Sequence, residues 1–247
     1  GQRDVDDAPS ITAYGFDASL TNFEGMGPKL LPLTLKPGDN EPGRIWADGE
    51  RLGKPVTWML RSKITTGFID AALEFVANAQ RAKKPFYINL WPDDVHSPFW
   101  PPVDRWADDK RDLYLSVLEE MDRQFGKLFD HIRDDASLRD NTLILVCSDN
   151  GPEPGAGSAG GLRGAKTTLF EGGIRSPLVA WGPGIIAPER AGAHDTTSVF
   201  AAFDLVPSLL TIAGATRPAG VAFDGEDISA TLLGRAAASR QAPIHWR

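Results

Sequence analysis

Apolar and polar positions along this 247-residue chain follow helical spacing in three places. The apolar side chains between Phe68 and Val76 recur every three or four residues, and Thr65 or Thr66 could serve as the N-cap of that helix. A longer apolar stripe with charged residues on the opposite side predicts an amphipathic helix over 111–133. A third helix is expected over 207–213.

Three nearly continuous apolar runs, at 86–91, 142–147 and 177–181, predict buried strands. Strands that alternate with helices indicate an α/β fold, with a mostly parallel central sheet covered by helices on both faces. We therefore expect the three strands to share one sheet and the 111–133 helix to pack against it. Residues 1–60 are rich in proline and glycine and have little periodicity, so we expect an irregular excursion there.

The composition excludes several classes of protein. A net charge of −7 with no dense basic patch argues against nucleic-acid binding. The longest apolar runs fall far short of the roughly 20 residues that a membrane-spanning helix needs. The single cysteine, Cys147, excludes an internal disulfide and a multi-cysteine metal site. It lies in an apolar run, which predicts an inert thiol in the core.

The strand expected at 142–147 ends abruptly in polar residues. Asp149 and Asn150 would place two hard oxygen ligands where strand meets loop, which suits a divalent cation. The basic residues Arg163 and Lys166 follow shortly afterwards and suit an anion held beside that cation. A cation with an anion-binding base is typical of an ester hydrolase acting on sulfate or phosphate. The alternative for the two basic residues is a mobile surface loop.

His96 follows the strand expected at 86–91. Because ligands collect at the carboxyl ends of strands in open α/β sheets, we expect His96 to lie near the polar residues that follow 142–147. Each feature also has a purely structural interpretation. Residues 148–151 form a common turn sequence, His96 could simply bond to backbone, and Asp93-Asp94 suit a solvated pair. Residues 155–160 match the dinucleotide-binding spacing but do not join a strand to a helix.

Taken in order, these motifs resemble the sulfatase family of the alkaline-phosphatase superfamily. The resemblance covers nearly the whole chain and departs at Ala165 and Thr167, where many relatives carry glycine. It rests on His96-Ser97-Pro98, Ser148-Asp149-Asn150-Gly151, Leu162-Arg163-Gly164-Ala165-Lys166 and the block from Thr168 to Pro177.

The resemblance implies a role for each candidate residue. Asp149 and Asn150 would bind a calcium ion, and Lys166 and Arg163 would bind the sulfate ester. His96 would contact the substrate or protonate the leaving oxygen. The implied substrate is a small sulfate ester or a sulfated glycan. The implied location, periplasmic or secreted, comes from the family alone, and the oligomeric state cannot be inferred from the sequence.

One element of the family is missing. The Cys- or Ser-x-Pro-x-Arg motif, whose first residue becomes the formylglycine nucleophile, does not occur in the chain. The resemblance therefore implies a fragment that is inactive alone, with 1–60 an excursion of the catalytic domain and 61–247 its central and C-terminal part. Two alternatives stay open: a phosphodiesterase or phosphonate monoester hydrolase of the same superfamily, and a non-catalytic binding protein on a degenerate sulfatase scaffold.

Overall fold

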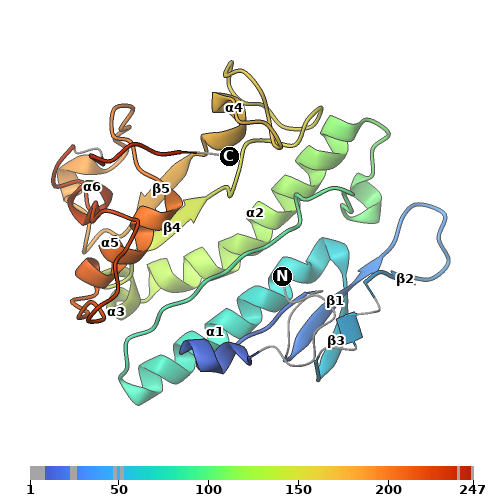
Figure 1. Ribbon diagram of the computed structural model, residues 1–247. Coiled ribbons are helices and arrows are strands. Elements are labelled where there is room, and N and C mark those ends of the chain that lie inside the picture. The colour runs from blue at the N-terminus through green and yellow to red at the C-terminus, as the bar shows by residue number, and fades with distance from the viewer. Residues whose placement is uncertain (1–8, 23–26, 47–48, 51–52, 238–239, 246–247) are drawn as a thin grey trace. The chain divides into compact units, whose positions relative to one another are not determined.

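The chain divides into two compact units. Figure 1 labels the helices and strands from which they are built. Unit 1 comprises residues 1–131 and 152–158, and unit 2 comprises 132–151 and 159–247. The division predicted at residue 60 does not coincide with the boundary between these two units. It was predicted as a division within a larger catalytic domain, and in that sense it stays a prediction. The computed structural model describes residues 9–22, 27–46, 49–50, 53–237 and 240–245.

Unit 1 contains a three-stranded sheet in the order β2-β1-β3. The central strand β1 (Lys29–Thr34) pairs in parallel with β3 (Val56–Leu60) and antiparallel with β2 (Gly43–Arg44). Regular structure therefore lies within residues 1–60, where we expected none. Almost every residue of β1 is buried, so the strand lacks an alternating pattern, and Pro32 in its middle argues against a strand.

Helix α1 (Ile64–Ala82) packs on this sheet through a buried stripe that includes Ile69 and Val76. Gly67 allows the close approach: a Cβ there would lie 2.5 Å from Cδ2 of Leu30 on β1. Burial of this stripe against the sheet stabilises the helix beyond its intrinsic propensity.

Helix α2 (Lys110–Asp134) matches the predicted 111–133 helix within one residue at each end. Gln124, which is buried on α2, accepts hydrogen bonds from the backbone N–H and the hydroxyl of Thr66, both at 2.8 Å. The predicted N-cap role of Thr65 or Thr66 is wrong, because α1 begins one residue before Thr65. Their hydroxyls serve tertiary contacts instead of a cap.

A small apolar cluster lies beside α2 in unit 1. Phe99, Val117 and Ala156 are buried together, and the rings of Phe99 and Tyr114 meet edge to face at 5.5 Å. Ala156 belongs to the short returning segment 152–158, which Arg111 also holds by donating to the Ala156 carbonyl at 2.9 Å. This segment therefore completes a core built mainly by residues far from it in sequence.

The strand predicted over 86–91 is not formed. The segment is extended, and its partly buried residues alternate with exposed ones, but it pairs with no strand among the described residues. An apolar run specifies an extended backbone and a buried face, whereas a strand also needs a partner for its hydrogen bonds.

Unit 2 contains a two-stranded antiparallel sheet. Strand β4 (Ile144–Cys147) pairs with β5 (Leu178–Trp181), with Ile144 opposite Trp181 and Cys147 opposite Leu178. Both strands lie where they were predicted, but a single sheet shared with 86–91 is wrong. The prediction of a buried Cys147 is also wrong, because the side chains at this end of β4 are exposed.

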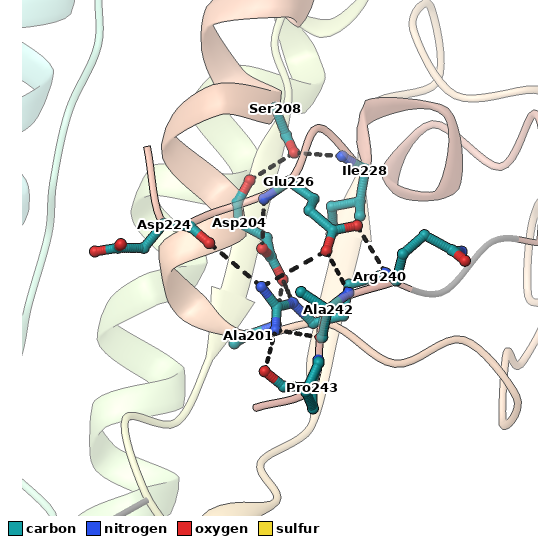
Figure 2. A network of polar contacts seen from close by, with 10 residues as sticks. Ala201, Asp204, Ser208, Asp224, Glu226, Ile228, Arg240, Ala242 and Pro243 are labelled. Carbon is teal, nitrogen blue, oxygen red and sulfur yellow. Dashed lines mark hydrogen bonds and ion pairs between the residues drawn. The ribbon is translucent and has the colours of Figure 1, made fainter. Parts of the chain in front are cut away.

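The C-terminal part of unit 2 is organised around a buried ion pair (Figure 2). Asp204, with no exposed surface, accepts from the backbone N–H groups of Ala201 and Glu226, both at 2.7 Å, and from Nε of Arg240 at 3.2 Å. Arg240 is itself buried and donates to the carbonyl of Ala242 at 2.6 Å. Each buried charge thus has an opposite charge and several hydrogen bonds, as burial of charge requires.

The predicted helix at 207–213 is confirmed as α5 (Leu205–Ile212), with Pro207 in its first turn. None of the helices in the described ranges is both long and apolar enough to cross a bilayer. The shorter helices are α3 (Ala136–Arg139), α4 (Glu171–Ile174) and α6 (Ser229–Leu232), with 3-10 turns at Ile11–Tyr14, Arg61–Lys63, Val103–Arg105, Pro188–Arg190 and Ala202–Asp204.

Candidate active site

Asp149 and Asn150 lie side by side directly after β4 in unit 2. The side-chain amide of Asn150 donates to Oδ1 of Asp149 at 2.9 Å and to the Gly151 carbonyl at 3.2 Å. The Ser148 hydroxyl closes the turn by donating to the Asn150 carbonyl at 2.9 Å. The second carboxylate oxygen of Asp149 and the amide oxygen of Asn150 stay available to a cation.

Glycines join this turn to the loop that carries the basic residues. The Gly151 N–H donates to the Gly173 carbonyl at 2.9 Å, and the Gly172 N–H donates to the Arg163 carbonyl at 2.7 Å. A Cβ on Gly151 would lie 1.9 Å from the Gly172 carbonyl oxygen, and one on Gly173 would lie 2.1 Å from the Thr168 carbonyl oxygen. Main chain therefore packs directly on main chain, which only glycine permits.

Lys166 lies in a tight turn within that loop. The Thr168 hydroxyl donates to the Ala165 carbonyl at 2.7 Å, and the Thr168 N–H donates to the same carbonyl at 3.1 Å. Thr167 has a φ of 74°, a left-handed conformation that costs a β-branched residue about 1–2 kcal/mol. This explains why glycine suits the position. The conformation of the turn is kept here despite the threonine.

Arg163 is held by an aromatic ring. Its guanidinium carbon lies 3.8 Å from the centroid of the Phe170 ring, a cation–π contact, and both side chains are exposed. Stacking fixes the plane of the guanidinium and leaves its edge N–H groups free to bind an anion. Main-chain hydrogen bonds and the Phe170 contact thus hold the loop that carries the two basic residues.

His96 is an exposed residue of unit 1. Its backbone N–H donates to the Asp93 carbonyl at 2.9 Å, and its ring Nδ1 lies 2.7 Å from the Ser97 carbonyl oxygen. The other four candidates, Asp149, Asn150, Arg163 and Lys166, all lie in unit 2. Main-chain hydrogen bonds join the turn that carries Asp149 and Asn150 to the loop that carries Arg163 and Lys166, and the convergence of all five side chains stays a prediction.

The sequence analysis missed a polar cluster beneath His96. Asp94 is buried, and its Oδ2 accepts from the Thr65 hydroxyl at 2.5 Å, so the prediction of a solvated Asp93-Asp94 pair is wrong. Burial raises the pKa of the Asp94 carboxyl, although the Thr65 hydrogen bond and the Arg61 charge oppose the shift. Asp93 pairs with Arg61 at 2.6 Å. No sequence pattern indicated this cluster, because Arg61 and Asp93 lie 32 residues apart.

Sequence and structure comparisons place these features in a family. A family model described as Sulfatase matches residues 38–215, which contain all five candidate residues. The chain belongs to the sulfatase family. It is 36% identical to human arylsulfatase A over 174 residues, and the match covers 69% of this chain and 33% of that protein. It is 32% identical to human N-acetylgalactosamine-6-sulfatase over 214 residues, covering 82% of this chain and 39% of that protein.

A solved structure shares the fold. The crystal structure of Ps i-CgsB in complex with k-i-k-neocarrahexaose superposes with a TM-score of 0.60 at 27% identity, over 68% of this chain and 38% of that one. This confirms the predicted α/β class as an incomplete alkaline-phosphatase-like sulfatase fold. The sulfatase chain described here spans about a third of the length of the curated relatives it matches.

Proposed function

We propose that this chain carries part of the active site of a calcium-dependent sulfuric ester hydrolase. The observation that supports it most directly is the main-chain hydrogen bond between Gly151 and Gly173. It ties a turn with two hard oxygen ligands to a loop with two basic side chains. A site of this kind can hold a divalent cation and an oxyanion side by side.

In this proposal Asp149 and Asn150 hold the calcium ion. The two side chains are in contact through the Asn150 amide nitrogen, and carboxylate and amide oxygens are ligands that calcium prefers. When bound, the ion supplies positive charge that polarises the sulfate oxygens. Among the described residues no group of three or more His, Cys, Asp or Glu side chains could hold a metal. Asp149 and Asn150 therefore fit one side of a coordination shell.

Lys166 and Arg163 bind the non-bridging oxygens of the sulfate group. The Lys166 ammonium is a point charge that stabilises negative charge as it spreads over these oxygens in the transition state. Arg163, oriented by Phe170, presents a planar fork that fits two oxygens of one tetrahedral anion. The turn held by Thr168 fixes the backbone position from which the Lys166 side chain extends.

His96 contacts the leaving-group side of the substrate and protonates the departing oxygen. Its ring is exposed, and its Nδ1 faces the Ser97 carbonyl, so Nε2 is the atom that meets the substrate. Protonation of a leaving oxygen by a positioned side chain contributes about 10²- to 10⁴-fold to a rate.

The proposed substrate is a sulfated glycan or a smaller sulfate ester. Support comes from relatives only: one is named for removal of sulfate from N-acetylgalactosamine, and the solved structure of another was determined with a neocarrahexaose. Both ligands are saccharides.

The test compares an aryl sulfate with a phosphate diester, using the full-length product of the gene. We expect turnover of the sulfate to fall by about 10²- to 10³-fold in Lys166→Ala. Lys84→Ala, a change of the same kind at an exposed position after α1, should leave it unchanged. Preferred hydrolysis of the diester would favour the phosphodiesterase alternative, and binding without turnover of either ester would favour the degenerate scaffold.

The 247-residue chain alone should not turn over sulfate esters, because it has no residue that can become the formylglycine nucleophile. Catalytic groups that act together lose nearly all activity when one is removed. Steady turnover by the chain alone that Lys166→Ala abolishes would mean that another residue is the nucleophile.

A further inference from the structure

Arg61 is the most completely enclosed arginine near His96. It follows β3 directly, and only 4% of its side chain is exposed. Nη1 donates to Oδ1 of Asp93 at 2.6 Å, and Nη2 donates to the Asp93 backbone carbonyl at 2.5 Å. The guanidinium carbon also lies 5.5 Å from the centroid of the Trp46 ring. The planar fork is therefore held in one orientation from two sides.

The Asp93 carbonyl is shared by two donors. It accepts from Nη2 of Arg61 and also from the His96 backbone N–H at 2.9 Å. A carbonyl oxygen has two lone pairs, so both hydrogen bonds can form at once. The second bond closes the four-residue turn from Asp93 to His96. Arg61 thus fixes the acceptor on which the conformation of this turn depends.

A contact of the His96 ring with the next residue indicates which of its nitrogens carries the proton. Its Nδ1 lies 2.7 Å from the Ser97 carbonyl oxygen, and a carbonyl can only accept. Nδ1 is therefore protonated, and Nε2 is the nitrogen that gains or releases a proton. Arg61, Ser97 and His96 also line one small hollow, together with the rings of Trp46 and Trp100.

We propose that Arg61 is a positioning residue for His96. It holds the Asp93 carbonyl, which sets the turn, which places the ring so that Nδ1–H bonds to Ser97 and Nε2 faces the leaving-group oxygen. This inference rests on the proposed function, in which His96 contacts the substrate. Arg61 itself touches no reacting atom.

The first test measures the tautomer of His96 directly, by ¹⁵N NMR of the imidazole rings at a pH where they are neutral. The native chain should give the Nδ1–H pattern at His96, and Arg61→Met should lose it. Asp93→Asn keeps the backbone carbonyl and should keep the pattern. Glu120→Gln should also keep it, because Glu120 contacts the start of α1 and α2 but not the 93–98 loop.

Retention of the Nδ1–H pattern in Arg61→Met, or its absence in the native chain, would overturn the inference. Should Arg61→Met fail to fold by circular dichroism, Arg61→Gln takes its place, because its amide cannot reach both acceptors. The same outcomes then apply to that variant.

The second test uses the full-length gene product and two aryl sulfates, one with a good and one with a poor phenol leaving group. Protonation matters more for the poor leaving group, so Arg61→Met should lower kcat for that substrate at least about tenfold more than for the other. His96→Ala should show the same bias. An equal loss on both substrates would overturn the inference. Absence of turnover in the native enzyme would refute the proposed function, while the imidazole spectra still decide the role of Arg61.

Discussion

Removal of the Asp204 carboxylate should unfold the C-terminal part of unit 2 more readily than any comparable change on its surface. Asp204 accepts three hydrogen bonds, two from backbone N–H groups and one from Arg240 (Figure 2). In Asp204→Ala the Arg240 guanidinium stays buried and keeps only its longer ion pair with Glu226, at 3.8 Å. Breaking a buried ion pair by removing one partner lowers the free energy of unfolding by about 3–5 kcal/mol. The cost of leaving the two backbone N–H groups without an acceptor is included in that figure, because all these contacts belong to one network.

The assay is native-state amide hydrogen exchange, which reports local stability even when the two units unfold separately. The Glu226 amide, which donates to Asp204, should exchange at least about a hundredfold faster in Asp204→Ala, since 1.4 kcal/mol is tenfold in an equilibrium constant. Asp204→Asn keeps one acceptor oxygen, so its exchange rate at the Glu226 amide should lie between those of the native chain and the alanine variant.

Asp195→Ala is the matched control. Asp195 also accepts three hydrogen bonds, from the N–H groups of Thr197 and Ser198 and from the Thr197 hydroxyl, but it is exposed. Hydrogen bonding by the side chain and the backbone N–H of Ser198, and then by Thr197, lowers the pKa of the Asp195 carboxyl, yet water can replace these partners. An Asp204→Ala effect no larger than that of Asp195→Ala would refute the reasoning that burial makes the difference.

Four further results are expected. Gly126 lies in the middle of α2, and a Cβ added there would have nothing within 4 Å. Because alanine favours a helix more than glycine does, Gly126→Ala should raise the free energy of unfolding in urea by about 0.5–1 kcal/mol, and a decrease would contradict this argument. Burial favours a higher pKa for Glu120, but hydrogen bonds from Arg123 and Lys63 outweigh it and lower the pKa. Glu120→Gln should therefore cost stability at pH 7, and this cost should shrink progressively as the pH falls below 4.5. Asp94 has a raised pKa, so its contribution to stability falls as the pH rises above 3.8, and the free energy of unfolding of Asp94→Asn relative to the native chain should rise from pH 4 to 7. A difference in unfolding free energy between variant and native chain that does not change with pH, measured in urea, would contradict both pH predictions. Calcium titration of the isolated chain should give a Kd weaker than about 10⁻³ M, because Asp149 and Asn150 supply too few ligands, and tight binding would disprove this.

The elements that could be predicted from sequence are those whose pattern is local. Helix α2 was predicted within one residue at each end because a 3.6-residue repeat over 25 residues has few competing explanations. Strand β1 was missed because a strand buried on both faces has no alternation, and Pro32 counted against it. Pairing was predicted least well: the runs at 86–91, 142–147 and 177–181 are equally apolar, and nothing in them specifies that only β4 and β5 pair.

In the candidate site too, residues in local motifs could be predicted and residues that depend on distant contacts could not. Asp149, Asn150 and Lys166 were recognisable because they lie in short motifs that resemble those of a known family, although each also had a purely structural interpretation. Arg61 was not, because its importance comes from a contact with Asp93, 32 residues away, and a lone arginine after a strand predicts no partner. The resemblance to sulfatases identified which motifs matter but said nothing of the contacts that hold them.

The interleaved order of the two units limits how the chain can be divided. The chain leaves unit 1 after residue 131, returns to it for 152–158 and leaves again, so neither unit is one continuous stretch. A chain cut after His131 would retain α1, most of α2 and the three-stranded sheet but lose Ala156, which is fully buried against Phe99 and Val117. Those two side chains would then face water. Splitting the gene at a single point, for expression in halves or for domain exchange with another sulfatase, would therefore leave at least one unit incomplete: a cut after His131 removes 152–158 from unit 1, and a cut after Ser158 removes 132–151 from unit 2.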